Sequence, residues 1–242
     1  MPTSPRVTDK SSKKPRNGRP ATPPSPTSPA PAALSVTGSP AAPLVLASSS
    51  LELKLDLGCG QNVREGFEGV DLHAPNAKHR VDLLKFPWPW ADASVDEIHC
   101  SHFIEHIPLR DVEERDLLAP HHPYLGKDLL FAFFDEAYRV LRPDSHMTVI
   151  CPSVRSERAF QDPTHRRFIA QATFFYLAVP ERKAMGLSHY RADCDFEGNV
   201  SFTHDAELTI RAAEYQQRVF KEAWNAIQDY VVKLKAIKPA RS

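Results

Sequence analysis

The stretch from Leu53 to Gly60 constrains the fold of this chain more than any other stretch. Leucine alternates with a charged residue over 53–57, which is typical of a short strand. The run then breaks into Gly58-Cys59-Gly60, where two glycines let the backbone turn sharply and leave space that side chains would fill. In open α/β sheets, ligands bind just past the carboxyl ends of strands. The stretch therefore predicts the floor of a nucleotide-type pocket.

Acidic and hydroxyl side chains follow the next strand-like segments. Asp71 comes directly after a glycine and a valine, Asp82 comes after another valine, and Ser101 directly follows the strand-like segment 95–100. A carboxylate that ends the second strand is where α/β nucleotide sites hold a ribose, because its oxygens accept two hydrogen bonds from the diol. The sequence thus predicts acidic groups at neighbouring strand ends.

The connection after the glycine turn is unusually short. Only residues 61–66 separate Gly60 from Phe67, whereas a parallel crossover usually takes about ten to twelve residues with its helix. We therefore expect a turn in place of the helix. Prolines within 85–93 exclude a helix or central strand there, and we expect Trp88 and Trp90 to pack this loop.

Apolar spacing predicts the remaining elements. Residues 129–141 repeat at helical spacing, and Arg142 and Pro143 mark the end of that helix. We expect a second helix over 207–224, with Asp205 as its cap and an apolar stripe along it. The expected later strands are 146–151, 200–202 and 230–237.

Three motifs in this order resemble the class I S-adenosylmethionine-dependent methyltransferases. They are Leu57-Gly58-Cys59-Gly60, Ser101-His102-Phe103-Ile104-Glu105-His106-Ile107 and Tyr138-Arg139-Val140-Leu141-Arg142-Pro143. The resemblance runs from about Leu51 to the C-terminus. It implies an α/β, Rossmann-like, seven-stranded and mostly parallel sheet whose last strand is antiparallel. It also assigns residues 50–242 to a methyltransferase domain.

The same resemblance implies S-adenosylmethionine as the cofactor and places its contacts. Gly58 and Gly60 would lie under the methionine part, and Asp56 would act near its ammonium group. Asp71 would take the ribose hydroxyls, and Asp82 would accept from the adenine amino group. The implied cofactor residues are Asp56, Gly58, Cys59, Gly60, Asp71, Leu72, Asp82, Leu83 and Ser101.

Methyl transfer from a sulfonium needs alignment and, for oxygen or nitrogen acceptors, removal of a proton. His165 is the candidate base, because imidazole titrates near neutral pH and similar Asp-Pro-x-His segments cover the acceptor side in the resembling proteins. A capping role for His165 is an equal alternative. His102 is the second candidate catalytic residue, facing the substrate. The expected acceptor is an unidentified small molecule or glycan-like compound.

Two other functions remain open from the sequence. His102-x-x-Glu105-His106 on a helix would place both histidine rings on one face, as in inverted zinc peptidases. We nevertheless assign no metal ligands, because no distant third ligand stands out. A catalytically silent scaffold with a cofactor fold is the other alternative. A dinucleotide-dependent dehydrogenase is disfavoured, because Val63 replaces the third glycine of its fingerprint.

Composition limits which partners, cellular setting and membrane association the chain can have. Residues 1–49 hold half of the 22 prolines, which predicts a disordered Pro/Ser/Ala-rich arm. Lys+Arg and Asp+Glu both total 30, which disfavours a nucleic-acid partner. The four cysteines form no Cys-x-x-Cys pair, and we expect small buried thiols in a reducing, cytoplasmic setting. We expect no membrane span and leave the oligomeric state open.

Overall fold

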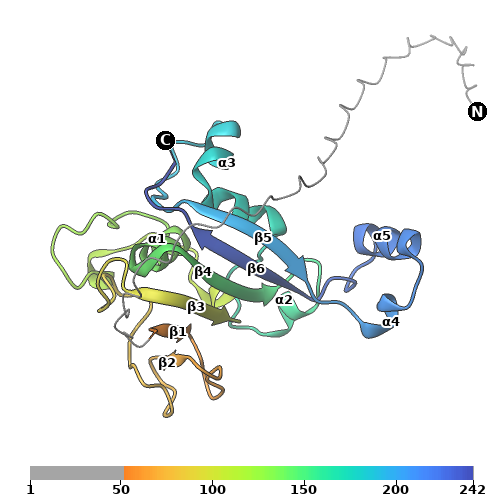
Figure 1. Cartoon of the computed structure of the whole chain (residues 1–242), viewed down its shortest axis with the longest axis horizontal. Coiled ribbons are helices and arrows are strands. Elements are labelled where there is room, and N and C mark those ends of the chain that lie inside the picture. Colours follow the sequence, from red (N-terminus) through yellow and green to blue (C-terminus); the bar gives the residue numbers. More distant parts are fainter. Residues whose placement is uncertain (1–51, 242) are drawn as a thin grey trace, which may run out of the picture. The chain divides into compact units, whose positions relative to one another are not determined.

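A computed structural model of the chain describes residues 52–241. The arm expected over residues 1–49 lies outside this range. The described part contains one six-stranded sheet in the order β2-β1-β3-β4-β6-β5 (Figure 1). Its strands are β1 (Lys54–Leu57), β2 (Glu68–Val70), β3 (Val95–Ser101), β4 (Leu141–Pro152), β5 (Phe196–Phe202) and β6 (Asp229–Ala236).

Strand directions follow the predicted pattern. β1 pairs with β2 and β3 in parallel, and β3 pairs with β4 in parallel. The last strand, β6, runs antiparallel to both β4 and β5, and its arrow is reversed in Figure 1. The prediction of a mostly parallel sheet with an antiparallel last strand is therefore confirmed.

The sheet has six strands among the described residues instead of the seven that we expected. A single parallel bridge between Val70 and His79 stands next to β2, where a further strand would lie. Its two backbone bonds join Asp71 N to His79 O and His79 N to Gly69 O. The segment 75–80 begins with a proline and is mostly polar, so it has little apolar surface to bury along a longer ladder.

The cross-strand register separates the sheet into apolar and polar rows. One row, aligned across four strands, is fully buried and consists of Leu55, Ile98, Met147 and Leu234. Each such side chain contributes about 1.5–3 kcal/mol when removed from water. The row beside it stays partly or fully exposed and consists of Lys54, Glu97, His146, Lys235 and Glu197. One face of the sheet therefore forms the core and the other is charged.

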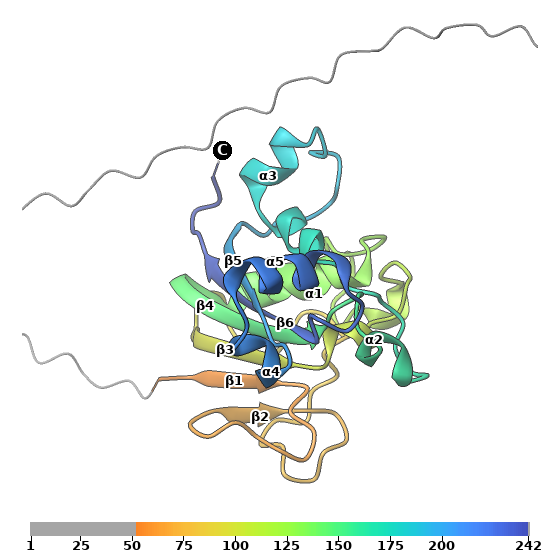
Figure 2. The ribbon, with the colours of Figure 1, turned by 90° about the vertical axis from the view of Figure 1, so that its right-hand side faces the viewer.

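Helix α1 (Leu129–Val140) packs on the apolar face. Its Phe133 and Ala137 belong to the same buried core as the leucine rows, and Figure 2 shows the helix beside the stacked strands β3 and β4. Asp128 begins the helix by accepting a hydrogen bond from the backbone of Leu130 at 2.8 Å. The predicted helix is confirmed, and β4 begins directly after it at Leu141.

The remaining connections are short. Residues 58–67 contain no helix, as the short crossover predicted. Trp88 is buried against Phe133, and Trp90 packs against His79, so both tryptophans pack their loop as expected. The other described helical segments are η1 (Ile104–His106), η2 (Glu114–Asp116), α2 (Arg158–Gln161), η3 (Gln171–Leu177) and α3 (Val179–Ala184).

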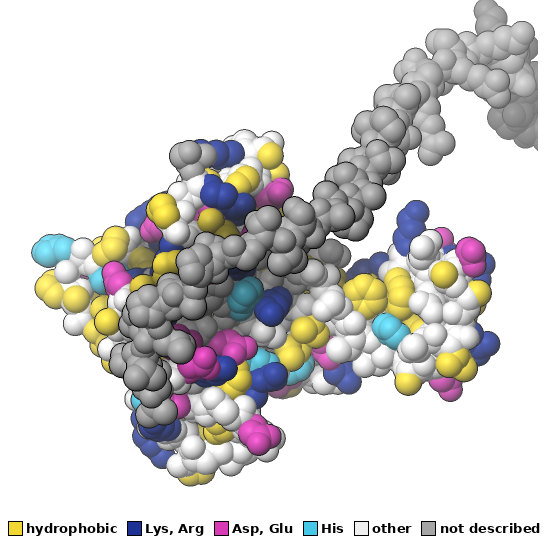
Figure 3. All heavy atoms as spheres, in the orientation of Figure 1, with side chains coloured by type: hydrophobic (Ala, Val, Ile, Leu, Met, Phe, Trp, Pro, Cys, Tyr) yellow, Lys and Arg dark blue, Asp and Glu magenta, His cyan; other side chains and the backbone are white. Residues whose placement is uncertain are grey.

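The single helix expected over 207–224 is wrong. The chain forms α4 (Ala206–Thr209) and α5 (Ala213–Glu222), with no buried residue in either, although Asp205 caps α4 as predicted. Adjacent β-branched residues, Thr209 and Ile210, weaken the helix where it breaks. Ile210 is 83% exposed, and Figure 3 shows apolar side chains on the surface of this segment. The apolar stripe therefore contributes nothing to the core.

The four cysteines are all free, and three of them, Cys100, Cys151 and Cys194, are buried as predicted. Burial raises the pKa of each of these three thiols. Among residues 52–241, no helix combines the length and the apolar character that crossing a bilayer requires.

Candidate cofactor and acceptor site

The carboxyl ends of β1 and β3 meet at the point where the strand order reverses. From β1 the chain moves to β2 on one side and later returns as β3 on the other side. The two ends are in contact, because a Cβ added to Gly58 would lie 2.5 Å from Cδ2 of Phe103. Such a switch point is where open α/β sheets bind ligands.

The two glycines of the turn have different surroundings. Gly58 has φ +67° and Gly60 has φ +53°, a region of backbone conformation that side-chain-bearing residues rarely adopt. Gly58 is tightly packed against Phe103, whereas a Cβ on Gly60 would meet no atom within 4 Å. The turn therefore packs against the fold at Gly58 and faces open space at Gly60.

Asp71 is joined directly to this turn. Its Oδ2 accepts from Gly60 N at 3.1 Å, and its Oδ1 accepts from the backbone N–H groups of His73 and Ala74 at 2.7 and 2.8 Å. Partial burial opposes ionisation, but the hydrogen bonds from Ala74, His73 and Gly60 outweigh it and lower the pKa of Asp71. The fold therefore stabilises Asp71 as an anion at the glycine turn.

Asp56 is the second carboxylate at the turn. It is 3% exposed, and its Oδ2 accepts from the backbone of Arg64 at 2.8 Å. Burial, followed by the charges of Asp56 and Asp71, raises the pKa of the Cys59 thiol, which lies near both carboxylates. The structure thus brings Asp56, Gly58, Cys59, Gly60 and Asp71 together.

The N–H groups of the turn are already used within the fold. Gly58 N and Cys59 N donate to Val70 O at 2.8 and 3.3 Å, and Gly60 N donates to Asp71. The groups left for a ligand at this end are mainly acceptors, namely two carboxylates and backbone carbonyls. The turn therefore suits a ligand that brings donors and positive charge, and it does not suit a phosphate.

The third acidic position, Asp82, forms no hydrogen bond with the glycine turn among the described residues. Asp82 Oδ1 accepts from Leu84 N at 3.0 Å, and the Leu83 carbonyl accepts from the Trp88 indole at 3.2 Å. The Leu83 side chain is buried in the core. Leu72, directly after Asp71, is 43% exposed and leaves an apolar surface beside that carboxylate.

The end of β3 carries Ser101 and leads directly into His102. Ser101 is the last residue of β3, and His102 follows it with φ +53°. Helix η1 is only three residues long and begins after His102, so His102 and His106 do not share one face of a regular helix. The alternative of a helical zinc motif at His102-x-x-Glu105-His106 is therefore contradicted, because the turn ends before Pro108 and has no room for another helical turn.

His102 instead lies against Glu105. Its Nδ1 is 3.2 Å from Glu105 Oε1, and this carboxylate raises the pKa of His102 above its usual value. His165 lies with His106, at 4.7 Å between ring centroids. The structure thus places both candidate catalytic histidines beside η1, although they come from segments about 60 residues apart in sequence.

Sequence reasoning missed several residues that shape this region. Phe103 fills the space against Gly58, and Thr164 Oγ1 lies 3.0 Å from His106 Nδ1. Arg64 lies over the Phe67 ring at 5.5 Å beside the turn. An aromatic residue two positions after a strand end was the one available signal for Phe103, and only the tertiary contacts identify the others.

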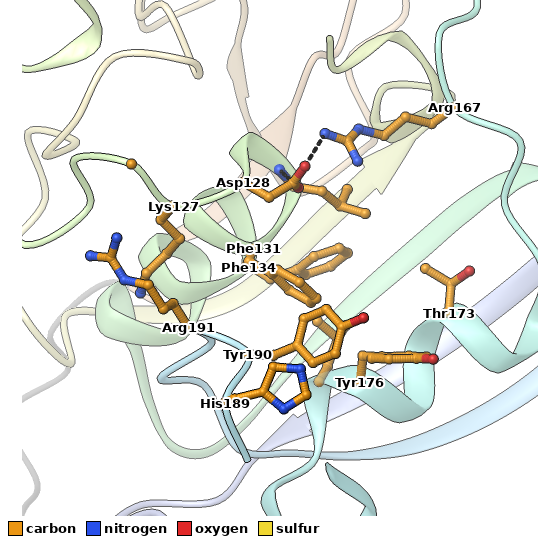
Figure 4. Close-up of a pocket in the computed structure, with 13 residues that line it drawn as sticks. Lys127, Asp128, Phe131, Phe134, Arg167, Thr173, Tyr176, His189, Tyr190 and Arg191 are labelled. Carbon is orange, nitrogen blue, oxygen red and sulfur yellow. Dashed lines mark hydrogen bonds and ion pairs between the residues drawn. The ribbon is translucent and has the colours of Figure 1, made fainter. Parts of the chain in front are cut away.

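A separate pocket of about 440 Å³ lies between α1 and η3 (Figure 4). Phe131, Tyr176 and Tyr190 form its aromatic wall, and His189 lies beside Tyr190. None of its lining residues belongs to β1, β2, β3 or the turns that follow them. His189 and Tyr190 therefore line a different pocket from the strand ends.

Comparisons with known proteins find similarity only to solved structures. No protein-family model matches the chain, and no curated protein does. The chain is similar to a solved S-adenosylmethionine-dependent methyltransferase from Archaeoglobus fulgidus, with 19% identity, a TM-score of 0.48, and coverage of 76% of this chain and 86% of that chain.

Two further solved structures give the same picture. A methyltransferase from Mesorhizobium loti shows 14% identity, a TM-score of 0.42, and coverage of 76% and 90%. A geranyl diphosphate C-methyltransferase from Streptomyces coelicolor A3(2), solved with Mg²⁺, geranyl diphosphate and S-adenosyl-L-homocysteine, shows 11% identity, a TM-score of 0.41, and coverage of 77% and 72%. These likenesses concern the course of the chain and assign it no activity.

Proposed function

We propose that this chain transfers a methyl group from S-adenosylmethionine to a small-molecule or glycan-like acceptor. The observation that carries the proposal is the glycine turn, which faces open space at Gly60 and is flanked by the carboxylates of Asp56 and Asp71. S-adenosylmethionine presents an ammonium group, a sulfonium, two ribose hydroxyls and an adenine amino group. The cofactor's charges and donors therefore match the acceptors at this turn.

The hydrogen bonds that Asp71 already accepts limit the role that we propose for it. A carboxylate has about four acceptor positions, and backbone N–H groups already occupy three of those on Asp71. Asp71 therefore takes one ribose hydroxyl in this proposal, and not both. Asp56 and the Gly58 carbonyl receive the ammonium end.

The adenine lies beyond Asp71 in this proposal. The exposed Leu72 side chain covers one face of the base, and Asp82 accepts from the amino group, with the Leu83 backbone nearby. The methyl group then points toward Ser101 and His102 at the end of β3. No contact within the described residues fixes Asp82 in this role, so its substitution is a separate test.

The transfer itself needs alignment and a route for one proton. A lone pair of the acceptor forms the bond to the methyl carbon, and the carbon–sulfur bond breaks with its electrons staying on sulfur. The proton of a hydroxyl acceptor leaves toward the basic nitrogens beside η1, among which His165 is the one that the sequence predicted.

Exposed aromatic rings border this end of the site. Phe160 and Phe168 stack at 4.6 Å between centroids, and Trp224 lies 5.9 Å from Phe160. All three are exposed, and Phe160 and Phe168 flank the segment that carries His165. Aromatic faces of this kind offer an apolar seat for a ring-shaped acceptor, which supports the sugar-like class.

Calorimetry with S-adenosylmethionine and S-adenosylhomocysteine tests the proposal. We expect one binding site per chain. Asp71→Asn should weaken the affinity, and Asp92→Asn should leave it unchanged, because Asp92 is an exposed carboxylate outside the glycine turn. A folded wild-type chain that binds neither compound at millimolar concentration would overturn it. Mass spectrometry of hydroxyl compounds and sugars incubated with the chain and cofactor then separates an enzyme from a silent scaffold, which binds without producing methylated product.

A further inference from the structure

Three potential metal ligands converge beside η1. One carboxylate oxygen of Glu105 and one ring nitrogen each of His106 and His165 all lie within 4.8 Å of one another. The two segments are joined through the backbone, because Glu105 O accepts from Arg166 N at 2.8 Å and from Arg167 N at 3.0 Å. The backbone therefore holds the cluster together even though its members are far apart in the sequence.

Glu105 is a buried carboxylate without hydrogen bonds. Its side chain is 1% exposed, and neither oxygen accepts a hydrogen bond from residues 52–241. His102 Nδ1 is 3.2 Å from Oε1 but outside hydrogen-bonding geometry, so it forms no directed bond to the carboxylate. A buried carboxylate in this state is costly unless a cation or donor satisfies it.

The hydrogen bonds of the two histidines leave a lone pair on Nε2 of each ring. His165 Nδ1 lies 2.9 Å from the Ala159 carbonyl, which can only accept, so the proton of a neutral ring is on Nδ1. Thr164 Oγ1 donates to Asp162 at 2.7 Å and therefore accepts from His106 Nδ1 at 3.0 Å. Such outer hydrogen bonds to oxygen are what fixes histidine ligands of metals.

We propose that Glu105, His106 and His165 bind one divalent transition-metal ion, with Zn²⁺ as the best match. Two imidazoles and one carboxylate form the protein ligand set of many catalytic zinc sites, which keep a further position open. Ligand atoms around a tetrahedral zinc are about 3.4 Å apart, so these side chains close by at most about 1.4 Å when the ion binds. His102 is not a ligand in this site.

The open position gives the ion a use in the reaction. An acceptor hydroxyl bound there loses its proton more readily, because the cation stabilises the alkoxide that attacks the methyl carbon. With the ion bound, His165 is a ligand in place of the base proposed above, and the proton of the bound hydroxyl passes to solvent water. This use rests on the proposed methyl transfer, whereas the metal site itself does not.

Zinc calorimetry on the full-length chain tests the site. The chain is treated with chelator, desalted and titrated with ZnCl₂, and Co²⁺ absorption provides a second readout of the ligands. We expect one ion per chain. His106→Ala and His165→Ala each weaken binding more than the about tenfold to hundredfold expected for Thr164→Val, which removes only the outer hydrogen bond.

The controls separate this ligand set from others. The partly exposed His204→Ala should leave zinc affinity within about twofold of wild type, because it neither contributes a ligand nor contacts one. His102→Ala removes a neighbour of Glu105 but no ligand, so it should change zinc affinity by no more than Thr164→Val does. Circular dichroism verifies the fold of each variant. Absence of zinc binding at micromolar concentration, retention of binding in His165→Ala, or an equal loss in His102→Ala would overturn the site. Cofactor calorimetry on the same samples reports the methyltransferase proposal independently.

Discussion

Replacing the glycines of the turn separates backbone strain from steric contact. Gly58→Ala places a methyl group at φ +67° and 2.5 Å from Phe103. The left-handed backbone costs about 1–2 kcal/mol, and overpacking adds about 1–3 kcal/mol. The expected loss in free energy of unfolding is therefore about 2–5 kcal/mol, or about 4–20 °C in Tm for a domain of this size.

Two other glycines provide matched controls. Gly60→Ala and Gly66→Ala also carry positive φ, but their Cβ atoms would meet nothing within 4 Å. For each variant the free energy of unfolding should fall only by the cost of backbone strain, about 1–2 kcal/mol. Gly60→Ala should in addition weaken S-adenosylmethionine binding by more than about tenfold, because its methyl group enters the open space assigned to the cofactor. Gly66→Ala should leave that affinity unchanged.

Urea unfolding and calorimetry measure these effects. In a Phe103→Ala background the additional cost of Gly58→Ala should fall toward that of Gly66→Ala, since the clashing ring is absent. Equal urea midpoints for Gly58→Ala and Gly66→Ala would refute the packing of Gly58 against Phe103. Unchanged cofactor affinity in Gly60→Ala would refute the placement of the cofactor over the turn.

Three further outcomes follow from the described contacts. The fold lowers the pKa of Asp71, so its contribution to stability is present above its unfolded pKa of about 3.9 and is lost as pH falls through the folded value. Asp71→Asn should therefore be less stable than wild type in urea unfolding at pH 7, and the difference should close toward pH 3. A difference that stays constant with pH would contradict this. The charge of Asp71 also raises the pKa of Cys59, so Asp71→Asn should speed its alkylation by iodoacetamide, and an unchanged rate would count against their proximity. Asp128→Ala removes the cap bond to Leu130 and the contact with Arg167 at 2.9 Å, which should cost about 1–2 kcal/mol in urea unfolding, and an unchanged urea midpoint would argue against the cap.

Local patterns predicted much of the sheet. The alternation before Gly58, the apolar spacing of 129–141 and the alternation of 230–237 each appear as the expected element, because their burial follows from residues near in sequence. The missing crossover helix was also predictable, since the length of 61–66 excluded it. The predictions of a seventh strand and of a continuous helix over 207–224 were wrong for the described residues, because neither segment packs an apolar face against the core.

The candidate site was predictable only where it coincides with strand ends. The position of Asp71 beside the glycine turn was predictable, because a carboxylate after a strand has a specific place in an α/β sheet. The association of His165 with Glu105 was not predictable, because it depends on backbone bonds between η1 and a loop about 60 residues later. The spacing of His102, Glu105 and His106 indicated a helix, but η1 is only one short turn before Pro108, so the two histidine side chains do not share a helix face.

The alternating rows of the sheet divide its positions by how freely they can change. Along β3, Ile98 is enclosed on the covered side, while its neighbour Glu97 shares its row with other half-exposed charges. In a collection of related sequences, every second position of these strands should drift in charge and size while the positions between them keep their volume. The sheet would then be recognised more reliably from the two-residue period of its apolar positions than from the identity of its residues.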